Sequence, residues 1–327
     1  MPILAGVDEA GLGPMLGPLV IGYAALRAPS HELDPWSELA EVVSRDPKRD
    51  AERVIVDDSK RVHARNGRGE RRLETTALSF LALLREGGRP PGDARFLFEE
   101  GPSPDPSWVG RHPWYEHLPA RLPLHRDAGA IELVAARLAR ALEAADMELV
   151  DCGVRIVPAG ELNASFEATR NKSQTLWLAT AEVLGHLWER AGEETTWLVA
   201  DQHGARTSYG GPLAQSFPAA SVRSEREQDD WHEFVLEPRE AQPARGALHL
   251  AFAPKADQRS FATALASCLA KYARELCMGA FNDFWAQRSP ELAPTAGYTT
   301  DARRWLGDAA PVLEQSGIPR SLLVRQR

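Results

Sequence analysis

Apolar residues along this chain follow two alternating patterns, which together predict a mixed α/β fold. Short apolar runs at residues 3–7, 19–26, 54–56, 149–157 and 197–201 have the length and the β-branched content of strands. The first two runs are separated by a glycine-rich segment. Several runs are followed by acidic residues, so the candidate chemistry lies at predicted strand ends.

Helical spacing of apolar residues occurs between these runs. It predicts helices at about residues 72–84, 129–147, 175–191 and 257–286. The last of these helices carries small residues at most inner positions, which lets it lie close against a sheet. Residues 222–253 alternate charged clusters with strand-like pieces and predict an enlarged hairpin.

Composition narrows the function classes. The 327 residues fill one large domain or two of ordinary size. A net charge of −8 and a pI of about 5.7 argue against nonspecific coating of nucleic acid, although they allow a local basic groove. The 3 cysteines lack CxxC spacing and indicate neither a disulfide framework nor a zinc cluster. No targeting segment or bilayer-length apolar run is evident, so we expect a cytoplasmic protein without a membrane partner. We also expect it to be a monomer.

Candidate chemistry begins with Asp8 and Glu9, adjacent acids at the end of the first predicted strand. Two carboxylates forced together repel, and either protonation or a bound divalent cation relieves their charge. Gly11 and Gly13 follow at once and would let a sugar-phosphate approach the backbone. An ordinary acidic, glycine-rich turn explains the same residues without any function. On a regular strand the two acids point to opposite faces, so a shared site requires a bend there.

Two further acids are candidates. Asp201 ends a predicted strand, where it either binds a metal or caps the following turn. Glu275 lies in the long predicted helix, on one face with Ser267 and Lys271. Lys271 and Glu275 are also compatible with an ordinary ion pair on a solvated face.

Five motifs, taken in order, resemble those of the type 2 ribonucleases H. They are GVDEAGLGPMLGPLVIG (6–22), DSK (58–60), LVADQHG (198–204), KADQRSFATALASCLAKYARELCM (255–278) and GYTT (297–300). The ordered set is more specific than any one motif, and the whole chain resembles a divergent ribonuclease HII or HIII. Arg274-Glu275 and Asp201-Gln202 resemble HIII, whereas an acidic motif within the first ten residues resembles the architecture of HII.

The resemblance implies a single ribonuclease H-like domain over residues 1–327, with a central mixed five-stranded sheet flanked by helices. Inserts are then expected at about 87–126 and 224–248, with a helical segment from about 297. Aromatic side chains of the first insert either form a base-stacking platform or pack together as a small apolar cluster. They are Trp108, His112, Trp114, Tyr115 and His117.

By motif, the resemblance also implies that Asp8, Glu9, Asp201 and Glu275 gather at one edge of the sheet, within reach of one metal pair. Four carboxylates can hold two Mg²⁺ or Mn²⁺ ions, one activating water and the other stabilising the leaving 3′ oxygen. The implied activity is an endoribonuclease that hydrolyses the RNA strand of RNA/DNA hybrids and leaves 3′-hydroxyl and 5′-phosphate ends. Hard oxygen ligands suit these ions better than zinc.

The resemblance further implies substrate contacts around these acids. Gly11 and Gly13 would reach a ribose 2′-hydroxyl, the group that distinguishes RNA from DNA, through their backbone. Leu12 stands where the HII family normally has an arginine, so cleavage at a single ribonucleotide in a duplex does not follow from the resemblance. Tyr298 would stack on a sugar or pack as a surface aromatic. Three residues would contact phosphate or brace the acids: Ser59, Lys60 and Lys255.

Two alternatives stay open. A degenerate protein of the same fold would bind RNA/DNA hybrid or a ribonucleotide-containing duplex without cutting it. Leu12, the acidic pI and Arg303, where the family often has histidine, motivate that hypothesis. The other alternative is a different two-metal nuclease or phosphohydrolase on a ribonuclease H-like fold, because a fold does not fix a substrate.

Overall fold

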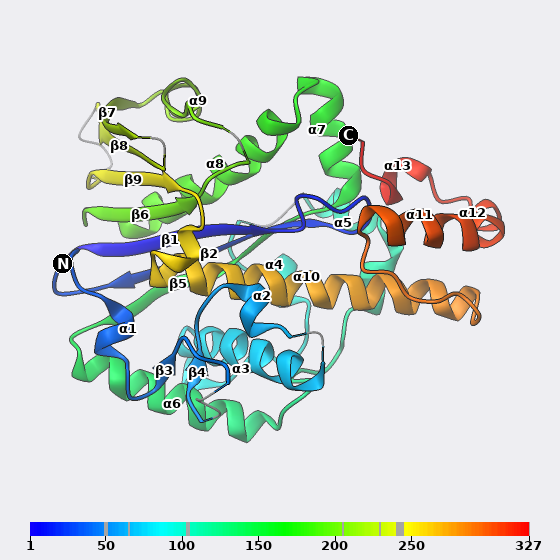
Figure 1. The fold of residues 1–327 in the computed structure, drawn as a ribbon, viewed down its shortest axis with the longest axis horizontal. Helices are drawn as coiled ribbons and strands as arrows, with labels where there is room; N and C mark the ends of the chain where they lie inside the picture. The colour runs from blue at the N-terminus through cyan, green and yellow to red at the C-terminus, as the bar shows by residue number, and fades with distance from the viewer. Residues whose placement is uncertain are drawn as a thin grey trace.

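The protein is described by a computed structural model that covers residues 1–48, 52–64, 66–102, 105–204, 206–228, 230–239 and 245–326. Over these residues, its centre is a seven-stranded mixed sheet in the order β5-β2-β1-β6-β9-β8-β7. Helices cover both faces of the sheet (Figure 1). The prediction of a mixed α/β fold with a central sheet is confirmed.

Five adjacent strands, from the edge strand β5 to β9, form the larger part of the sheet. β1 (Ile3–Ala10) and β2 (Leu19–Arg27) are an antiparallel hairpin around the glycine-rich turn, and β5 (Glu148–Val157) pairs with the far side of β2. β6 (Thr196–Asp201) runs parallel to β1, and β9 (Leu248–Ala253) runs parallel to β6. The carboxyl ends of β1, β6 and β9 therefore meet at one edge of the sheet.

The predicted hairpin extends this sheet, which makes seven described strands rather than the expected five. β7 (Ala220–Gln228) and β8 (Trp231–Pro238) pair with each other, and β8 pairs antiparallel with β9. Within the region expected as an insert at 224–248, residues 224–228 and 231–238 thus continue the backbone hydrogen bonding of the sheet, while residue 229 and residues 240–244 lie outside the described residues. The short run predicted at 54–56 is β4 (Val54–Ile55), which pairs with β3 (Val43–Ser44) in a separate two-stranded sheet.

The lower face of the sheet in Figure 1 is covered by α10 (Phe261–Arg288), with α3 (Gly67–Leu83) and α6 (Ala128–Ala144) beneath it. The opposite face carries α8 (Lys172–Ala191), and α7 (Ala159–Thr169) and α9 (Gly210–Ser216) complete that layer. The helices predicted at 72–84, 129–147, 175–191 and 257–286 correspond to α3, α6, α8 and α10. The remaining short helices are α1 (Pro35–Glu38), α2 (Ser59–Val62), α4 (Phe96–Glu99), α5 (Pro106–Gly110), η1 (Glu86–Gly88), η2 (Pro113–His117) and η3 (Ala256–Gln258).

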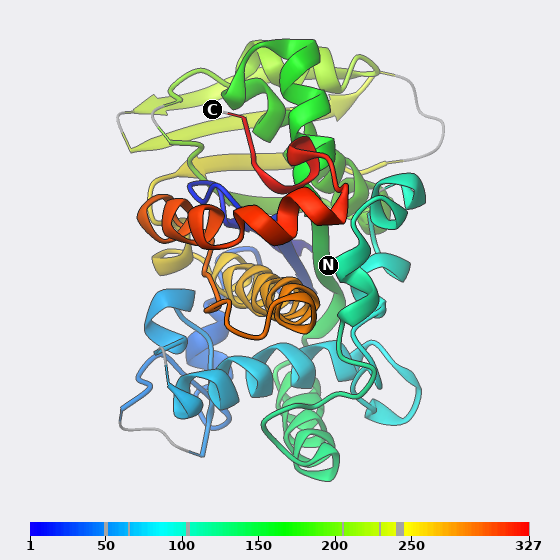
Figure 2. The same ribbon diagram turned by 90° about the vertical axis from the view of Figure 1, so that its right-hand side faces the viewer.

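The chain ends in α11 (Thr299–Asp308), α12 (Ala310–Ser316) and α13 (Arg320–Leu323), which confirms a helical segment from about residue 297. Figure 2 shows these helices at one end of the molecule, close to the end of α10. None of the helices within the described ranges has the length and apolar character needed to cross a bilayer.

Two strand glycines let α10 lie directly on the backbones of β1 and β2. A Cβ atom at Gly6 would stand 2.1 Å from the backbone nitrogen of Thr263, and one at Gly22 would stand 2.0 Å from the carbonyl oxygen of Ala266. Contacts this short are impossible for a real side chain, so only glycine allows this approach. The small residues noted along the predicted helix face the sheet at this contact, where Ala266 is fully buried.

Aromatic residues of the first insert pack into the core. Trp114 and Tyr115 are buried, and the Trp114 ring meets Phe281 of α10 edge to face with centroids 5.3 Å apart. His112 is also buried, and its Nε2 accepts a hydrogen bond from the backbone of Gly160 at 3.1 Å. For these three residues the structure supports an apolar cluster rather than a base-stacking platform.

Replacing Gly22 should test the helix–sheet contact. We expect Gly22→Ala to lower the free energy of unfolding by about 3 kcal/mol or more, the upper end of the range for overpacking, because the new methyl group overlaps the α10 backbone. Gly279→Ala, on α10 with open space around its Cα, should be neutral or stabilising by up to about 1 kcal/mol. Urea unfolding of both variants provides the measurement, and equal stabilities would contradict this packing.

Candidate metal centre

Three carboxylates meet at the edge of the sheet. Asp8, Glu9 and Asp201 each offer an oxygen atom, and these atoms all lie within 4.8 Å of one another. β1 remains paired with β2 as far as Ala10, whereas its pairing with β6 ends at Val7. Beyond that point β1 runs alone past the end of β6. The strand continues unbroken through Asp8 and Glu9 to Ala10, so the two acids approach Asp201 without a break in β1 between them.

Asp8 faces α10. Its side chain is only 8% exposed and lies against the hydroxyl of Ser267, which favours the ionised carboxylate. The Ser267 hydroxyl also lies 3.0 Å from that of Ser59, at the start of α2. Two buried hydroxyl groups therefore connect the DSK segment to the acid cluster. Ser59 contacts Ser267, which in turn contacts Asp8, and this arrangement supports the predicted bracing role of Ser59.

Asp201 holds the chain that leaves β9. Its Oδ1 accepts a hydrogen bond from the backbone nitrogen of Ala256 at 3.0 Å. Lys255 adopts the left-handed conformation with a φ of 55°, which turns the chain sharply after the strand. This turn brings Asp257, in η3, close enough to raise the pKa of Asp8. Asp257 is therefore the fourth acid beside the cluster, and the sequence interpretation missed it.

Burial and mutual repulsion disfavour the ionised forms of these acids and so raise their pKa values. Burial is the main cause that raises the pKa of Asp8 to about 8, and the charge of Asp201 adds to it. Burial, followed by the charge of Asp8, raises the pKa of Glu9 well above its usual range. Burial also raises the pKa of Asp201, and burial with the charge of Asp58 raises that of Asp257 to about 6. A divalent cation would stabilise the ionised forms of these carboxylates together.

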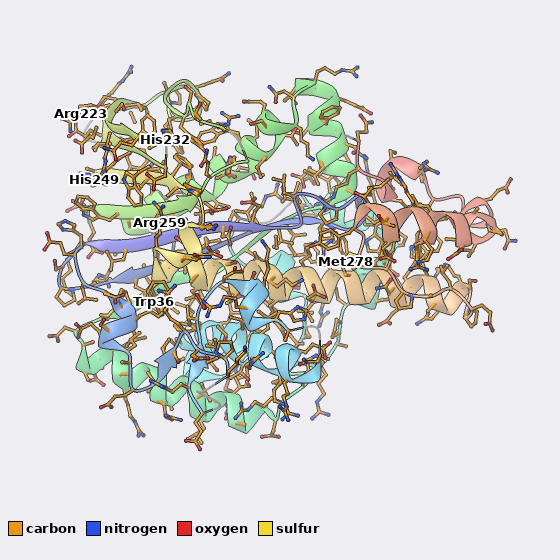
Figure 3. All side chains as sticks on the ribbon, in the orientation of Figure 1. Trp36, Arg223, His232, His249, Arg259 and Met278 are labelled. Atoms are coloured by element: carbon orange, nitrogen blue, oxygen red, sulfur yellow. The ribbon has the colours of Figure 1, made fainter. Side chains whose placement is uncertain are left out.

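Glu275, predicted as a fourth ligand, lies elsewhere. It is two helical turns beyond Ser267 on α10, which is about 12 Å along the axis at about 1.5 Å per residue. Figure 3 marks the direction: Arg259 stands near the start of α10, and Met278, three residues after Glu275, lies far along it.

Glu275 also has its own partners. Its carboxylate forms an ion pair with Lys271. Burial raises the pKa of Glu275, but the charge and hydrogen bond of Lys271, together with the charges of His63 and Arg274, lower it below the usual value. It lines a cavity of about 470 Å³ together with His63 and Tyr272. The prediction of Glu275 as a metal ligand is therefore corrected: the structure shows the ordinary i, i+4 ion pair.

The glycine-rich turn is held from below by two arginines. Gly11 has a φ of +88°, and a Cβ there would overlap the Arg274 side chain. The Gly11 carbonyl accepts a hydrogen bond from Arg325, whose Nε also donates to the Gly17 carbonyl at 2.8 Å. Burial, with the nearby charge of Arg274, lowers the pKa of Arg325 to about 9. No periodic pattern in the sequence points to Arg325, which lies 308 positions from Gly17.

Leu12 turns away from this turn into the protein. It packs with the apolar cluster above the sheet and borders a small hollow beside Leu162 and Phe166. Gly13 is exposed, and a Cβ there would meet nothing within 4 Å. Open space for a ligand backbone is therefore present at Gly13, whereas the Leu12 side chain does not line it.

Tyr298 stands beside the turn at the start of α11. Its ring is 46% exposed, and the Arg274 guanidinium lies over it at 5.6 Å. The preceding Gly297 carbonyl accepts hydrogen bonds from Met15 and Leu16, at 2.8 and 3.2 Å. These contacts dock the GYTT segment onto the glycine-rich turn.

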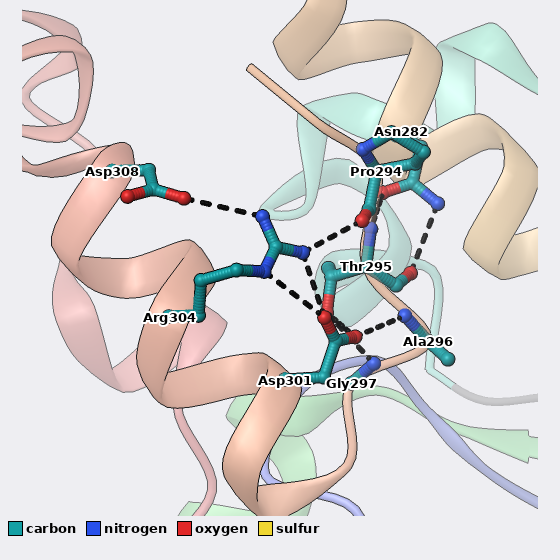
Figure 4. A network of polar contacts seen from close by, with 8 residues as sticks. All are labelled: Asn282, Pro294, Thr295, Ala296, Gly297, Asp301, Arg304 and Asp308. Atoms are coloured by element: carbon teal, nitrogen blue, oxygen red, sulfur yellow. Dashed lines mark hydrogen bonds and ion pairs between the residues drawn. The ribbon is translucent and has the colours of Figure 1, made fainter.

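A polar network fixes this docked segment (Figure 4). Asp301 accepts hydrogen bonds from the Thr295 hydroxyl at 2.6 Å and from the Ala296 backbone at 2.8 Å. Arg304 joins Asp301 to the Pro294 carbonyl, and Asn282 of α10 binds the Thr295 backbone. The exposed ring of Tyr298 therefore extends from a rigid support.

Two lysines stand at the mouth of the cluster. Lys60 is exposed, and its charge lowers the pKa of Glu9, Asp201 and Asp257. Lys255 is exposed as well, and its backbone hydrogen bonds to Asp201. The structure thus brings the predicted residues Asp8, Glu9, Asp201, Ser59, Lys60 and Lys255 together, with Gly11, Gly13 and Tyr298 on the adjoining turn.

A second group that could hold an ion lies on the outer strands, where Glu225, Glu233 and His249 approach within the same 4.8 Å. Figure 3 labels His249 and the neighbouring Arg223 there. Arg223 pairs with Glu225, and the Trp231 indole donates to Glu233 at 3.2 Å. Both carboxylates of this group thus already have the side chain of Arg223 or Trp231 as a partner. Over the described residues, the hydrogen bonds to the three acids at the sheet edge come from backbone groups and Ser267.

Comparison with known proteins gives the following. No protein-family model and no curated protein sequence matches this chain. Among solved structures, ribonuclease HII of Archaeoglobus fulgidus, in complex with PCNA, is 15% identical with a TM-score of 0.42, over 99% of this chain and 94% of that one. Ribonuclease H3 of Aquifex aeolicus is 13% identical with a TM-score of 0.42, over 98% and 71%. Bst-RNase HIII in complex with Mn²⁺ is 14% identical with a TM-score of 0.43, over 99% and 66%.

These matches are all type 2 ribonucleases H, the family that the five motifs resemble. At such identities and TM-scores, the likeness assigns neither an activity nor a ligand to this chain.

Asp257 and Glu275 can be compared directly in metal binding. We expect Asp257→Asn to weaken Mn²⁺ affinity by roughly tenfold or more, the scale seen for residues that support a metal site, because an acid beside the cluster is lost. Glu275→Gln should leave the affinity unchanged. Isothermal titration of both variants checks this, and the reverse order would restore Glu275 as a ligand.

Asp8→Asn should change stability in opposite directions with and without metal. Because the folded protein raises the pKa of Asp8, its ionised form destabilises the fold as pH rises above the unfolded value of 3.8 towards 8. At pH 8 in EDTA, relief of about 1 kcal/mol would raise the melting temperature by about 1–2 °C. With Mg²⁺ or Mn²⁺ the wild type should gain stability and the variant should not. A variant that melts lower in EDTA would contradict the repulsion inferred here.

Proposed function

We propose that this protein is a metal-dependent endonuclease of the ribonuclease H type, which hydrolyses the RNA strand of RNA/DNA hybrids. The observation that supports this most is the meeting of Asp8, Glu9 and Asp201 at one sheet edge, with oxygen atoms within 4.8 Å of one another. The five motifs, in the order found in the type 2 ribonucleases H, support RNA/DNA hybrids as the substrate class. All acids of the cluster come from one chain, so a monomer has a complete site.

The donor set fits Mg²⁺ or Mn²⁺. It consists of carboxylates, which are the hard ligands that these ions prefer. We propose that Asp8, Glu9 and Asp201 hold the metal, with Asp257 beside them in the place first given to Glu275. When bound, the metal would activate a water molecule and stabilise charge on the leaving oxygen, giving 3′-hydroxyl and 5′-phosphate ends.

The residues around the acids would bind and orient the substrate. The exposed lysines Lys60 and Lys255 would hold phosphate groups at the mouth of the cluster, where the acids alone would repel them. The open backbone at Gly13, next to Gly11 in the same turn, would approach a ribose 2′-hydroxyl. The exposed ring of Tyr298 would stack on a neighbouring sugar or base, and Arg274 below it would keep the ring in place.

Recognition of a single ribonucleotide lies outside the proposal. Leu12 offers no charge, and it packs into the protein rather than toward the open turn. Arg274 does not replace the missing arginine, because it is 2% exposed beneath Gly11. We therefore propose cleavage within continuous stretches of RNA paired with DNA.

Cleavage of a labelled RNA/DNA hybrid tests this proposal. We expect cutting with Mg²⁺ or Mn²⁺, and a loss of at least about 10²-fold in Asp8→Asn, since metal stabilisation of developing charge is worth several kcal/mol. Glu275→Gln, which keeps the acid cluster intact, provides the matched control and should stay active.

A substrate panel separates the alternatives. Binding of hybrid by the wild type without cutting would indicate a degenerate binding protein. Equal cutting of double-stranded DNA or RNA would indicate another two-metal nuclease and would contradict the proposed substrate.

A further inference from the structure

Basic side chains gather around a hollow that the proposed reaction does not use. This hollow has a volume of about 580 Å³ and lies between β4 and the start of α3. Its lining includes Lys48, Arg53, Arg68, Arg71, Arg72 and Arg126. Among the described residues that line it there is no carboxylate, although the whole chain has a net charge of −8. The positive charge is therefore a local feature rather than a result of composition.

A second hollow adjoins the first. Its volume is about 680 Å³, and it shares Pro47 and Lys48 with the first hollow. Arg45 and Arg61 line its far side and both pair with the buried Asp57, while Asp46 is the carboxylate among its described lining residues. We call the two hollows together the basic track.

The positive charges of the first hollow are largely uncompensated. Over the described residues, no ion pair involves Arg68, Arg71, Arg72 or Arg126. Arg72 donates to the Pro47 carbonyl at 2.6 Å, but its buried Nε has no hydrogen-bond partner in the described part of the chain. A buried guanidinium N–H without an acceptor is costly, and a ligand oxygen would satisfy it.

The start of α3 adds to this potential. α3 has 17 residues, and its first turn carries Arg68 and borders the hollow. The partial positive charge of a helix amino end favours anions within about one turn. Asn66 caps the helix by accepting from the backbone of Arg68 and Gly69, at 3.1 and 3.0 Å. The arginine side chains therefore remain available at the rim.

The basic track leads to the acid cluster through α2. Arg61 borders the second hollow, where it pairs with the buried Asp57. The residue before it, Lys60, acts on the charges of Glu9, Asp201 and Asp257. One short helix thus carries a cation at the candidate site and another at the track.

We propose that the basic track binds the sugar-phosphate backbone of a nucleic-acid duplex whose cleaved strand lies at the acid cluster. This inference rests on the proposed function and names where the duplex continues beyond the site. Two connected hollows lined by arginines suit consecutive phosphates, since guanidinium groups bind phosphate oxygens in pairs. A small anion would occupy only one hollow. It would leave unexplained why basic residues line both hollows and continue along α2 to Lys60.

The test uses Arg68→Gln/Arg71→Gln, because both side chains are exposed and neither forms a side-chain hydrogen bond or ion pair within the described part of the chain. The control is Arg121→Gln/Arg140→Gln, which removes the same charge from exposed positions outside the track. All proteins also carry Asp8→Asn so that the duplex stays intact. Binding of labelled RNA/DNA hybrids from 8 to 30 base pairs is followed by fluorescence anisotropy at several salt concentrations.

We expect the control to bind longer duplexes more tightly than shorter ones, and the Arg68/Arg71 variant to lose most of that gain. Each lost phosphate contact lowers the slope of log K against log salt by about 0.9, so the variant slope should be shallower by up to about 2. Equal slopes and equal length dependence in variant and control would overturn the track. Binding of inorganic pyrophosphate that the variant loses, with duplex binding unchanged, would also overturn it in favour of a small-anion site.

The outcome is separable from that of the proposed function. A wild type that neither binds nor cuts hybrid contradicts the proposed function itself. A wild type that cuts hybrid, alongside an Arg68/Arg71 variant that binds long duplexes like the control, contradicts the track alone.

Discussion

The direct contact between α10 and the backbones of β1 and β2 determines most of the geometry around the candidate site. Gly6 and Gly22 have no side chains, so the helix lies against the strands with no layer of side chains between them. Successive turns of α10 then place Ser267 against Asp8 and Arg274 beneath Gly11. The helix thus supports both the acids and the glycine-rich turn, and any change in its distance from the sheet would move the two together.

The carboxylate cluster follows from where strands end rather than from how they bend. β1 continues along β2 after its parallel neighbour β6 has ended. The two acids of β1 therefore approach Asp201, and burial raises the pKa of each of them. Without a cation, the repulsion among these carboxylates lowers the free energy of unfolding, and the packing of the surrounding core offsets that loss. A protein without a use for such a cluster would gain stability by losing it, which favours a functional role.

Sequence patterns predicted several strands of the sheet and the long helices, because apolar periodicity is a local signal. The meeting of Asp8, Glu9 and Asp201 was implied only by the resemblance of the ordered motifs, since acids at strand ends do not show by themselves which strands are neighbours. The sequence did not predict which residues lie close together in space when that depends on the course of a helix or the order of the strands. Ser267 and Glu275 share a helix face, but a helix that runs along the sheet carries the second about 12 Å beyond the first. Asp257 follows the end of β9 as Asp201 ends β6, a signal that the parallel strand order would have revealed. The position of Arg325 depends on tertiary packing alone and had no local signal.

Anomalous diffraction from crystals soaked in Mn²⁺ tests most directly whether the acids at the sheet edge form a metal centre, as proposed here. A metal centre there predicts anomalous density bounded by the carboxylates of Asp8, Glu9 and Asp201, with Asp257 adjacent. Density confined to Glu225, Glu233 and His249, or to the surroundings of Glu275, would contradict it. So would the absence of density at the acid cluster at Mn²⁺ concentrations that stabilise the protein in solution.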